Sequence, residues 1–309
     1  MLKDVFRHVL CYNMVVAKNG IKKVGIITKH NIKIKENATY FKNLINALKS
    51  YNVDLLFDNV CGELAGKEKT YTKSQILRRC DLAIILGGDG TLLKTAREMG
   101  LMRPLIAGVN MGHLGFLTAF TTQKFLTSLP KIFKKQFCED ERFLLRVTIY
   151  RNNKKHFTTL ALNEAVINQG GFARLINMRV EINQRELANY RADGLIVSTP
   201  TGSTGHALSA YGPIIHPKID GFLLVPLCPM KLGVRPIIIP NDRQIIIKLE
   251  TQWRDEKKPI VLTIDGQVTL NLKKGDTIRV RKSRRTFRMI RMGNHNYYKM
   301  LRKKLNWGG

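Results

Sequence analysis

The first half of the chain alternates short apolar runs with amphipathic stretches. Residues 24–27, 53–57, 82–86 and 105–109 are apolar enough to be buried strands. Between the first two runs, apolar side chains recur at helical spacing after Asn37, a candidate helix cap, at Tyr40, Phe41, Leu44, Ile45 and Leu48. A second helical pattern follows the run at 82–86, with Leu92, Leu93, Ala96 and Met99 on one face. Strands separated by helices predict βαβ units and a parallel sheet.

The pattern changes near residue 140 to the period of two that is typical of half-buried strands. Residues 143–149 and 178–182 alternate apolar and polar side chains, and residues 160–167 form an apolar strand. Short β-rich runs follow at 237–239, 245–249, 260–264, 268–272 and 277–280. Asp265-Gly266 and Lys274-Gly275-Asp276 are typical of hairpin turns between them. We therefore expect an all-β second half with a sandwich of stacked sheets, followed by a helix over 297–307.

The length of 309 residues suits about two domains. We expect an unassigned N-terminal extension over residues 1–20 and an α/β domain over 21–141. A β-rich domain over 142–280 and a basic C-terminal segment with a helix over 281–309 complete the expected organisation.

Composition excludes several classes of protein. Hydrophobic residues make up 44% of the chain and charged residues 24%, as in globular proteins. No apolar run approaches the ~20 residues that span a bilayer, and charged residues interrupt the first twenty positions. The five cysteines form no CxxC pair and no metal-ligand spacing, which favours reduced thiols. We expect a cytoplasmic protein with no membrane partner.

The net charge of +29 is extreme and attracts polyanions. No acidic residue follows Asp276, whereas the same segment holds eleven basic ones: Arg279, Arg281, Lys282, Arg284, Arg285, Arg288, Arg291, Lys299, Arg302, Lys303 and Lys304. A solvated basic surface explains this run better than a nucleic-acid site, so we expect nucleic-acid binding to be non-specific at most.

The first candidate for chemistry is Gly87-Gly88-Asp89-Gly90-Thr91, between a buried strand and a helix. Ligands of open α/β sheets bind at such positions, and glycines let a phosphate approach the backbone. A carboxylate repels phosphate unless it holds Mg²⁺ or takes a proton from an attacking hydroxyl. The alternative is a tight turn in which Asp89 caps the helix. The loop matches neither a P-loop nor GxGxxG.

Two further stretches could bind a ligand. After Asp193-Gly194, the hydroxyl-rich run from Ser198 to Gly205 could form a polar cradle, with Ser203 or Thr204 capping a short helix. Loops often have this composition without binding anything. Asn163-Glu164 interrupts the apolar run at 160–167, and buried polar groups need partners. Hydrogen bonding across the sheet and a ligand site are equally good explanations.

In combination, these motifs resemble the NAD kinases. The glycine loop, Asn163-Glu164 and the stretch from Asp193 to Thr204 occur in the order and spacing of that family. The resemblance continues through 108–117, Arg235-Pro236, Asp265-Gly266-Gln267 and 304–307, and it covers about residues 21–309. Lipid kinases and 6-phosphofructokinases share the glycine loop. In lipid kinases, however, Asn-Glu follows it almost directly, whereas here it comes 72 residues after Thr91.

The resemblance implies phosphoryl transfer from ATP, or from another phosphate donor such as polyphosphate, to the 2′-hydroxyl of the adenosine ribose of NAD. A divalent metal such as Mg²⁺ would accompany ATP. It implies an α/β nucleotide-binding domain with a parallel sheet, an all-β substrate-binding domain, and a C-terminal segment that returns to the first domain. The family's proteins are usually homo-oligomers, so a dimer or tetramer is expected.

The resemblance also assigns site residues. Asp89 would be the catalytic base, with Gly88, Gly90 and Lys94 near the ligand. Asn163 and Glu164 would hold adenine and ribose hydroxyls. The remaining expected substrate contacts are Arg174, Arg191, Asp193, Thr204, Gly205, His206, Ala207, Leu208, Ser209 and Gln267. The metal ligands stay unassigned.

The chain departs from the family at two places in the hydroxyl-rich motif. Gly205-His206 stands where Ala-Tyr is common, and Tyr211 stands where a glycine is common. Two alternatives to an NAD kinase remain: a lipid kinase of the same superfamily, or a non-catalytic nucleic-acid-binding protein on a kinase fold.

Overall fold

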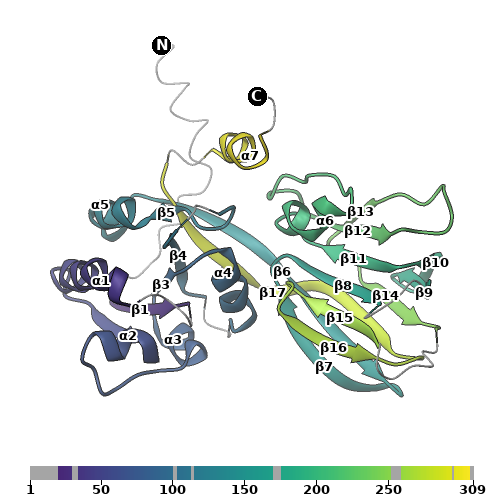
Figure 1. Cartoon of the computed structure of the whole chain (residues 1–309), viewed down its shortest axis with the longest axis horizontal. Coiled ribbons are helices and arrows are strands. Elements are labelled where there is room, and N and C mark those ends of the chain that lie inside the picture. Colours follow the sequence, from purple (N-terminus) through teal and green to yellow (C-terminus); the bar gives the residue numbers. More distant parts are fainter. Residues whose placement is uncertain are drawn as a thin grey trace, which may run out of the picture. The chain divides into compact units, whose positions relative to one another are not determined.

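The computed structural model describes residues 20–29, 34–99, 103–112, 115–169, 175–251, 259–293 and 296–306. The expected N-terminal extension lies outside these residues except for Gly20. The chain forms two compact units: residues 1–141 with 287–309, and residues 142–286 (Figure 1). None of the helices in the described residues combines the length and apolar character needed to cross a bilayer.

The first unit is built on a parallel sheet of strand order β2-β1-β3-β4-β17, with β5 beside β4. Its strands are β1 (Lys23–Thr28), β2 (Asp54–Phe57), β3 (Leu82–Leu86), β4 (Leu105–Asn110), β5 (Phe120–Thr121) and the end of β17 (Thr277–Arg291). Its helices are α1 (Ile34–Lys49), α2 (Asn59–Leu64), α3 (Lys73–Arg79), α4 (Asp89–Arg97), α5 (Thr122–Phe133) and α7 (Tyr297–Leu305). The predicted parallel sheet and C-terminal return are confirmed, because Arg288 and Met289 pair with β4.

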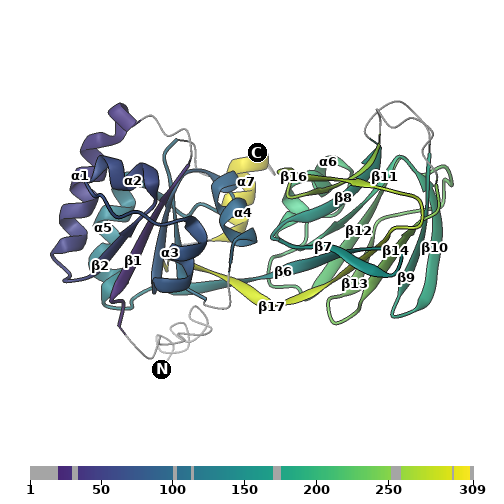
Figure 2. The ribbon, with the colours of Figure 1, turned by 90° about the horizontal axis from the view of Figure 1, so that it is seen from below.

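Helices cover both faces of this sheet (Figure 2). Buried side chains of α1 and α5, among them Leu44 and Phe125, pack against alternate strand residues such as Ile26 and Ile84. On the other face, a Cβ added at Gly25 would lie 2.1 Å from Ile76 of α3, and one at Gly108 would lie 2.9 Å from Leu92 of α4. Asn37 does not cap α1, which begins three residues earlier at Ile34.

The second unit stacks two sheets, as predicted. One contains β10-β9-β14-β17, with β6 beside β17 and β7 beside β6, and the other has the order β13-β12-β11-β8-β15-β16. The strands new to this unit are β6 (Cys138–Arg151), β7 (Lys154–Ala161), β8 (Glu164–Gln169), β9 (Ile176–Ile182), β10 (Arg185–Ala192), β11 (Gly194–Ser198), β12 (Gly221–Leu227), β13 (Ile237–Pro240), β14 (Ile245–Leu249), β15 (Ile260–Ile264) and β16 (Val268–Leu272).

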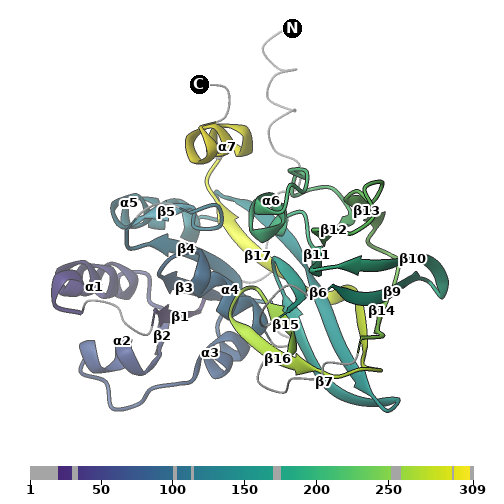
Figure 3. The same ribbon diagram turned by 45° about the vertical axis from the view of Figure 1, so that its right-hand side comes forward.

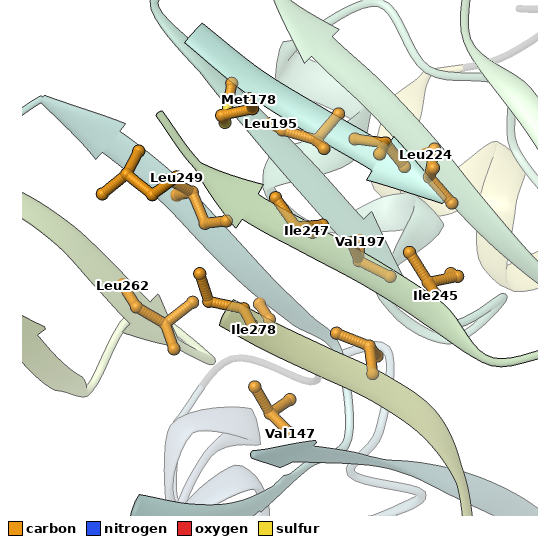
Figure 4. Packing of buried hydrophobic residues seen from close by; sticks show 14 of the residues in the cluster. Val147, Met178, Leu195, Val197, Leu224, Ile245, Ile247, Leu249, Leu262 and Ile278 are labelled. Carbon is orange, nitrogen blue, oxygen red and sulfur yellow. The ribbon is translucent and has the colours of Figure 1, made fainter. Parts of the chain in front are cut away.

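The core of the second unit lies between these sheets. Val147, Ile247 and Ile278 of one sheet face Val197 and Leu262 of the other (Figure 4). The outer face of the second sheet is covered by the short helix α6 (His206–Ser209), whose Ala207 packs with buried side chains of β8, β11 and β12 (Figure 3).

One local prediction about strands is wrong, and another strand is longer than predicted. The apolar run at 160–167 is not one strand, because β7 ends at Ala161 and β8 begins at Glu164 in the other sheet. The strand predicted at 277–280 continues to Arg291. Within the first unit, its basic residues are paired: Arg288 with Glu139, and Arg291 with Asp140 at 2.9 Å. Part of the basic run is therefore structural, because Arg291 is only 3% exposed.

Candidate functional site

In the first unit, the glycine loop joins the fully buried strand β3 to α4 at the carboxyl edge of the sheet. The Gly87 N–H donates to the Val109 carbonyl of the neighbouring strand at 2.9 Å. Gly88 is the N-cap of α4, and Asp89 is its first helical residue. The alternative in which Asp89 caps the helix is therefore wrong, and the carboxylate is directed elsewhere.

The Asp89 carboxylate accepts hydrogen bonds from the segment that follows β4. Its Oδ2 accepts the Phe116 N–H at 2.7 Å. Its Oδ1 accepts the N–H groups of Leu117 and Thr118 at 3.1 and 3.0 Å, and the Thr118 hydroxyl at 3.3 Å. Oδ2 thus retains more lone-pair capacity than Oδ1, because a carboxylate oxygen can accept about two hydrogen bonds.

The segment after β4 is shaped to hold this carboxylate. The buried Thr118 hydroxyl accepts the Asn110 amide at 3.1 Å and the Gly115 N–H at 2.8 Å. A Cβ at Gly115 would lie 2.0 Å from Asp89 Oδ1, so only glycine permits the close approach. The motif at 108–117 thereby acquires a physical role, although His113 and Leu114 lie outside the described residues.

Two lysines of the first unit interact electrostatically, and sequence reasoning found only one of them. Lys94 is an exposed residue of α4. Burial lowers the pKa of Lys73 at the start of α3, and the charge of Lys94 lowers it further, whereas Glu98 and Asp58 raise it. Nothing in the local pattern around Lys73 marks it, because Lys94 lies 21 residues further along the chain.

In the second unit, Asp265 organises the turn that carries Asn163 and Glu164. The buried Asp265 carboxylate accepts the N–H groups of Leu162, Asn163 and Glu164 at 3.1, 2.8 and 3.1 Å. Its own N–H donates to the Glu164 carbonyl at 3.0 Å. These bonds turn the chain between β7 and β8, which is why the run at 160–167 is divided. Sequence reasoning noted Asp265 as part of a motif and missed this organising role.

Glu164 is 5% exposed, and its environment favours the neutral carboxyl. Burial raises the pKa of Glu164 to about 8, the Asp265 charge adds to the rise, and a hydrogen bond from the His206 N–H opposes it. Within the described residues, Glu164 Oε2 and Asn163 Oδ1 are buried without a hydrogen-bond partner. A Cβ at Gly205 would lie 3.1 Å from Glu164 Oε2 and 3.4 Å from the Asn163 amide nitrogen. These two side chains and the backbone at 205–206 therefore form one polar cluster.

The hydroxyls of the Ser/Thr-rich stretch bond mainly within its own loop. Thr199 Oγ1 donates to the Leu162 carbonyl at 2.6 Å, and Ser203 Oγ donates to the Pro200 carbonyl at 2.7 Å. Thr204 Oγ1 donates to the Thr201 carbonyl at 3.3 Å. Neither predicted cap is present, since Gly205 is the N-cap of α6 and no side chain caps this helix.

The remaining predicted site residues are placed at different points of the second unit. His206 and Ser209 are exposed on α6, with Ala207 buried and Leu208 half-buried. Gln267 is exposed in the β15–β16 turn, two residues from Asp265. Arg191 lies at the end of β10, and Asp193 directly precedes β11. In β11, Ser198 pairs with Glu164, and Gly194 pairs with Asn168 about 13 Å away along the strand. Arg174 lies outside the described residues.

The described residues contain no group of three or more His, Cys, Asp or Glu side chains arranged to hold a metal ion. Asp89 is the carboxylate of the glycine loop, and both of its oxygens already accept backbone N–H groups. The loop as it stands therefore does not fit a resident metal.

Two family models match the chain. The ATP-NAD kinase N-terminal domain matches residues 11–137, and the ATP-NAD kinase C-terminal domain matches residues 162–292. They include the glycine loop and the Asn163-Glu164 turn, respectively.

Similar proteins agree with these models. An NAD kinase of Geotalea daltonii is 42% identical over 77% of this chain and 83% of the relative. An NAD kinase of Syntrophotalea carbinolica is 36% identical over 93% of this chain and 99% of the relative.

Solved structures extend the likeness to the whole fold. Yeast NADH kinase, solved with NADH, has a TM-score of 0.84 at 25% identity and covers 94% of this chain and 89% of its own. An NAD kinase from Archaeoglobus fulgidus, solved with ATP, has a TM-score of 0.69 at 26% identity and covers 93% and 100%. These matches favour neither the lipid-kinase nor the non-catalytic alternative. The glycine loop, the Asn163-Glu164 turn and the two-unit fold thus occur together in a chain that belongs to the NAD kinase family.

Proposed function

We propose that this protein transfers the terminal phosphoryl group of ATP to the 2′-hydroxyl of the adenosine ribose of NAD and so produces NADP. Membership of the NAD kinase family supports the reaction. The observation in this chain that best supports the reaction is a pair of buried oxygen atoms, Asn163 Oδ1 and Glu164 Oε2. Neither has a hydrogen-bond partner among the described residues. Buried polar atoms cost free energy unless a ligand or water completes them.

The polar cluster of the second unit would hold the adenosine half of NAD. Asn163 Oδ1 would accept a hydrogen bond from the adenine amino group or a ribose hydroxyl. Glu164, largely protonated at pH 7, would donate or accept a bond at Oε2. Further contacts are proposed for Gln267 and for the turn and helix formed by Thr204, Gly205, His206, Ala207, Leu208 and Ser209.

The other half of NAD would extend along β11. Asp193 precedes Gly194, which lies about 13 Å along β11 from Ser198, the residue that pairs with Glu164, and Arg191 lies at the end of β10. This length suits an extended dinucleotide rather than a compact ligand. Arg174 is proposed for the same end of the site.

Asp89 would act as the general base on the 2′-hydroxyl. A ribose hydroxyl is a poor nucleophile until its proton leaves, and a positioned carboxylate contributes roughly 10²–10⁴-fold. Asp89 Oδ2 is the better atom for this step, because it accepts one described hydrogen bond whereas Oδ1 accepts three. The bonds at Oδ1 would fix the carboxylate while Oδ2 takes the proton, with Gly88 and Gly90 leaving room beside it.

Lys94 and Lys73 would hold phosphate oxygens and offset the charge that develops during transfer. We propose that the divalent cation, Mg²⁺, enters with ATP. In kinase sites Mg²⁺ keeps several waters and is held largely by substrate phosphates. When bound, the cation would neutralise part of the negative charge of the phosphates.

We also propose that the protein is a cytoplasmic homo-oligomer, a dimer or a tetramer. The edge strand β13 supports self-association, since Ile237 and Ile238 are 38% and 47% exposed and neighbouring Leu232 is 88% exposed. Unprotected apolar edges are typical of interfaces. Buried thiols suit a reducing compartment: burial raises the pKa of Cys80 to about 12, which keeps it unreactive.

The test is an assay of the purified protein with Mg-ATP and NAD. We expect NADP to form and diacylglycerol to remain unphosphorylated; lipid phosphorylation without NADP would refute the proposal. Asp89→Asn should lower turnover by at least ~10²-fold.

The matched control for this variant is Asp81→Asn. Asp81 accepts the N–H groups of Lys22 and Lys23 at 2.9 and 2.8 Å, just before the other end of β3. Asp81→Asn, like Asp89→Asn, removes a carboxylate that accepts hydrogen bonds from the backbone, but it should leave turnover near normal. Equal losses in the two variants would remove Asp89 from the role of base.

A further inference from the structure

The outward face of the first sheet in the second unit gathers arginines from β6 and β17. Arg279 of β17 lies 4.7 Å from the ring centroid of Tyr150 on β6, and its guanidinium donates to the Tyr150 hydroxyl at 3.4 Å. Side chains alternate between the faces of a strand. Arg146 therefore shares the face of Tyr150, and Arg281 and Arg285 share the face of Arg279.

Contacts on the opposite face agree with this assignment. Lys282 lies 5.3 Å from the ring of Phe143, which packs against the core between the sheets. The buried residues Val147 and Val280 also face that core. β6 and β17 lie side by side in the sheet, as Figures 1 and 3 show.

Arg146 of β6 interacts electrostatically with three arginines of β17. Burial lowers the pKa of Arg146, and the charges of Arg281, Arg285 and Arg284 lower it further. Within the described residues, neither Arg146 nor Arg281 has a carboxylate at ion-pair distance, whereas Arg151, at the end of the same strand as Arg146, is paired with Asp276 at 2.7 Å. The fold thus concentrates positive charge here, and within the described residues no ion pair neutralises the charge of Arg146 or Arg281.

We propose that Arg146, Arg281 and Arg285, the arginine surface, bind the phosphate backbone of single-stranded RNA without sequence preference. All three residues are arginines, whose planar guanidinium groups bind phosphate oxygens through paired hydrogen bonds. Alternate residues of a strand stand about 6.6 Å apart, so the surface offers cations at regular intervals to a linear polyanion. Arg279, whose guanidinium covers the Tyr150 ring, adds a further cation on the same face.

The neighbouring side chains favour RNA over an anionic membrane. Thr148 and Thr158 bond to one another on this face, and Tyr150 is half-buried under Arg279. Binding to a lipid surface is strengthened by apolar side chains that insert between headgroups. The arginine surface is separate from the residues proposed for catalysis, so RNA binding and NADP formation should be separable.

The test compares two variants of the full chain that lose the same charge. One carries Arg146→Gln, Arg281→Gln and Arg285→Gln. The control carries Lys42→Gln, Lys124→Gln and Lys131→Gln, all exposed on α1 and α5 of the first unit. Binding of a fluorescent 20-nucleotide oligouridylate is measured by anisotropy from 50 to 300 mM salt, together with NADP formation.

We expect the arginine variant to bind at least tenfold more weakly at 50 mM salt. Its slope of log K against log salt concentration should fall by about 2, at ~0.7 for each phosphate that an arginine no longer neutralises. The control should bind with an affinity changed by less than threefold, and both variants should form NADP at the normal rate. A third variant with lysine at the three arginine positions should keep most of the slope at reduced affinity, which also guards against loss of folding.

Three outcomes would overturn the proposal. If RNA binding is weakened equally in the arginine variant and in the control, the net charge of the whole protein attracts the RNA and no local surface is involved. Absence of oligouridylate binding by the unmodified protein at 50 mM salt would exclude the partner. Binding to phosphatidylserine vesicles that depends on the three arginines, without binding to the RNA, would assign the surface to membranes instead.

Discussion

Replacing Glu164 with glutamine should make the stability of the protein less dependent on pH. Glutamine has nearly the shape of the neutral carboxyl that burial and Asp265 favour at this site. It can still accept the His206 N–H, and it cannot ionise. The substitution therefore removes the cost of a buried charge while retaining the packing around Gly205.

The magnitude follows from the two pKa values. In the unfolded chain the carboxyl ionises near 4.5, whereas in the folded protein it retains its proton to about 8. The folded state therefore binds more protons between these values, and its free energy of unfolding falls as pH rises through this window. At ~1.4 kcal/mol per pH unit for one proton, the unmodified protein should lose about 2 kcal/mol between pH 6 and 8 that Glu164→Gln does not lose. Above about pH 9, where the carboxyl is ionised in both states, the difference becomes constant.

The assay is urea denaturation of the unmodified protein and of Glu164→Gln without nucleotide at pH 6, 7 and 8. Melting temperatures give a second measurement. At ~2–4 °C per kcal/mol, the melting temperatures of the two proteins should differ by about 4–8 °C more at pH 8 than at pH 6. Glu186→Gln, at a carboxylate that is 53% exposed, provides the control and should show no such trend. A difference between the unmodified protein and Glu164→Gln that stays constant within ~0.5 kcal/mol from pH 6 to 8 would refute the reasoning.

Three further predictions concern the parts that position the site. Gly115→Ala should lower turnover at least tenfold with a smaller change in the Michaelis constant, because its Cβ would lie 2.0 Å from Asp89 Oδ1. Steady-state kinetics test this prediction, and Gly293→Ala, which has open space around the added Cβ, is the control. Asp265→Asn should lower the free energy of unfolding by about 2–3 kcal/mol in urea, because an amide cannot accept all three N–H groups of residues 162–164; a loss below ~0.5 kcal/mol would contradict its organising role. His206→Ala should raise the Michaelis constant for NAD several-fold while His206→Tyr is tolerated, and unchanged kinetics from pH 5.5 to 8 would place the exposed imidazole outside the site.

The sequence by itself determined the architecture, because hydrophobic periodicity is a local property. The buried run Leu82–Leu86 and the helical pattern after it required a strand, a turn and a helix, and the structure has all three. The period of two beyond residue 140 likewise required a second half with stacked sheets. The motifs also identified the family, because glycine loop, Asn163-Glu164 and hydroxyl-rich stretch occur together in a fixed order.

Only the tertiary structure decided how the polar residues are used. The partners of Asp89 lie 27 to 29 residues away, and those of Asp265 lie about 100 residues away, so no local pattern could reveal them. The same separation explains why the sequence predicts one strand over 160–167, where the structure has the end of β7 and the start of β8. Arg146 and Arg281 lie far apart in the sequence, and pairing of β6 with β17 brings their charges together. Hydrogen bonds and electrostatic interactions depend on distance in space, which hydrophobic periodicity along the chain does not encode.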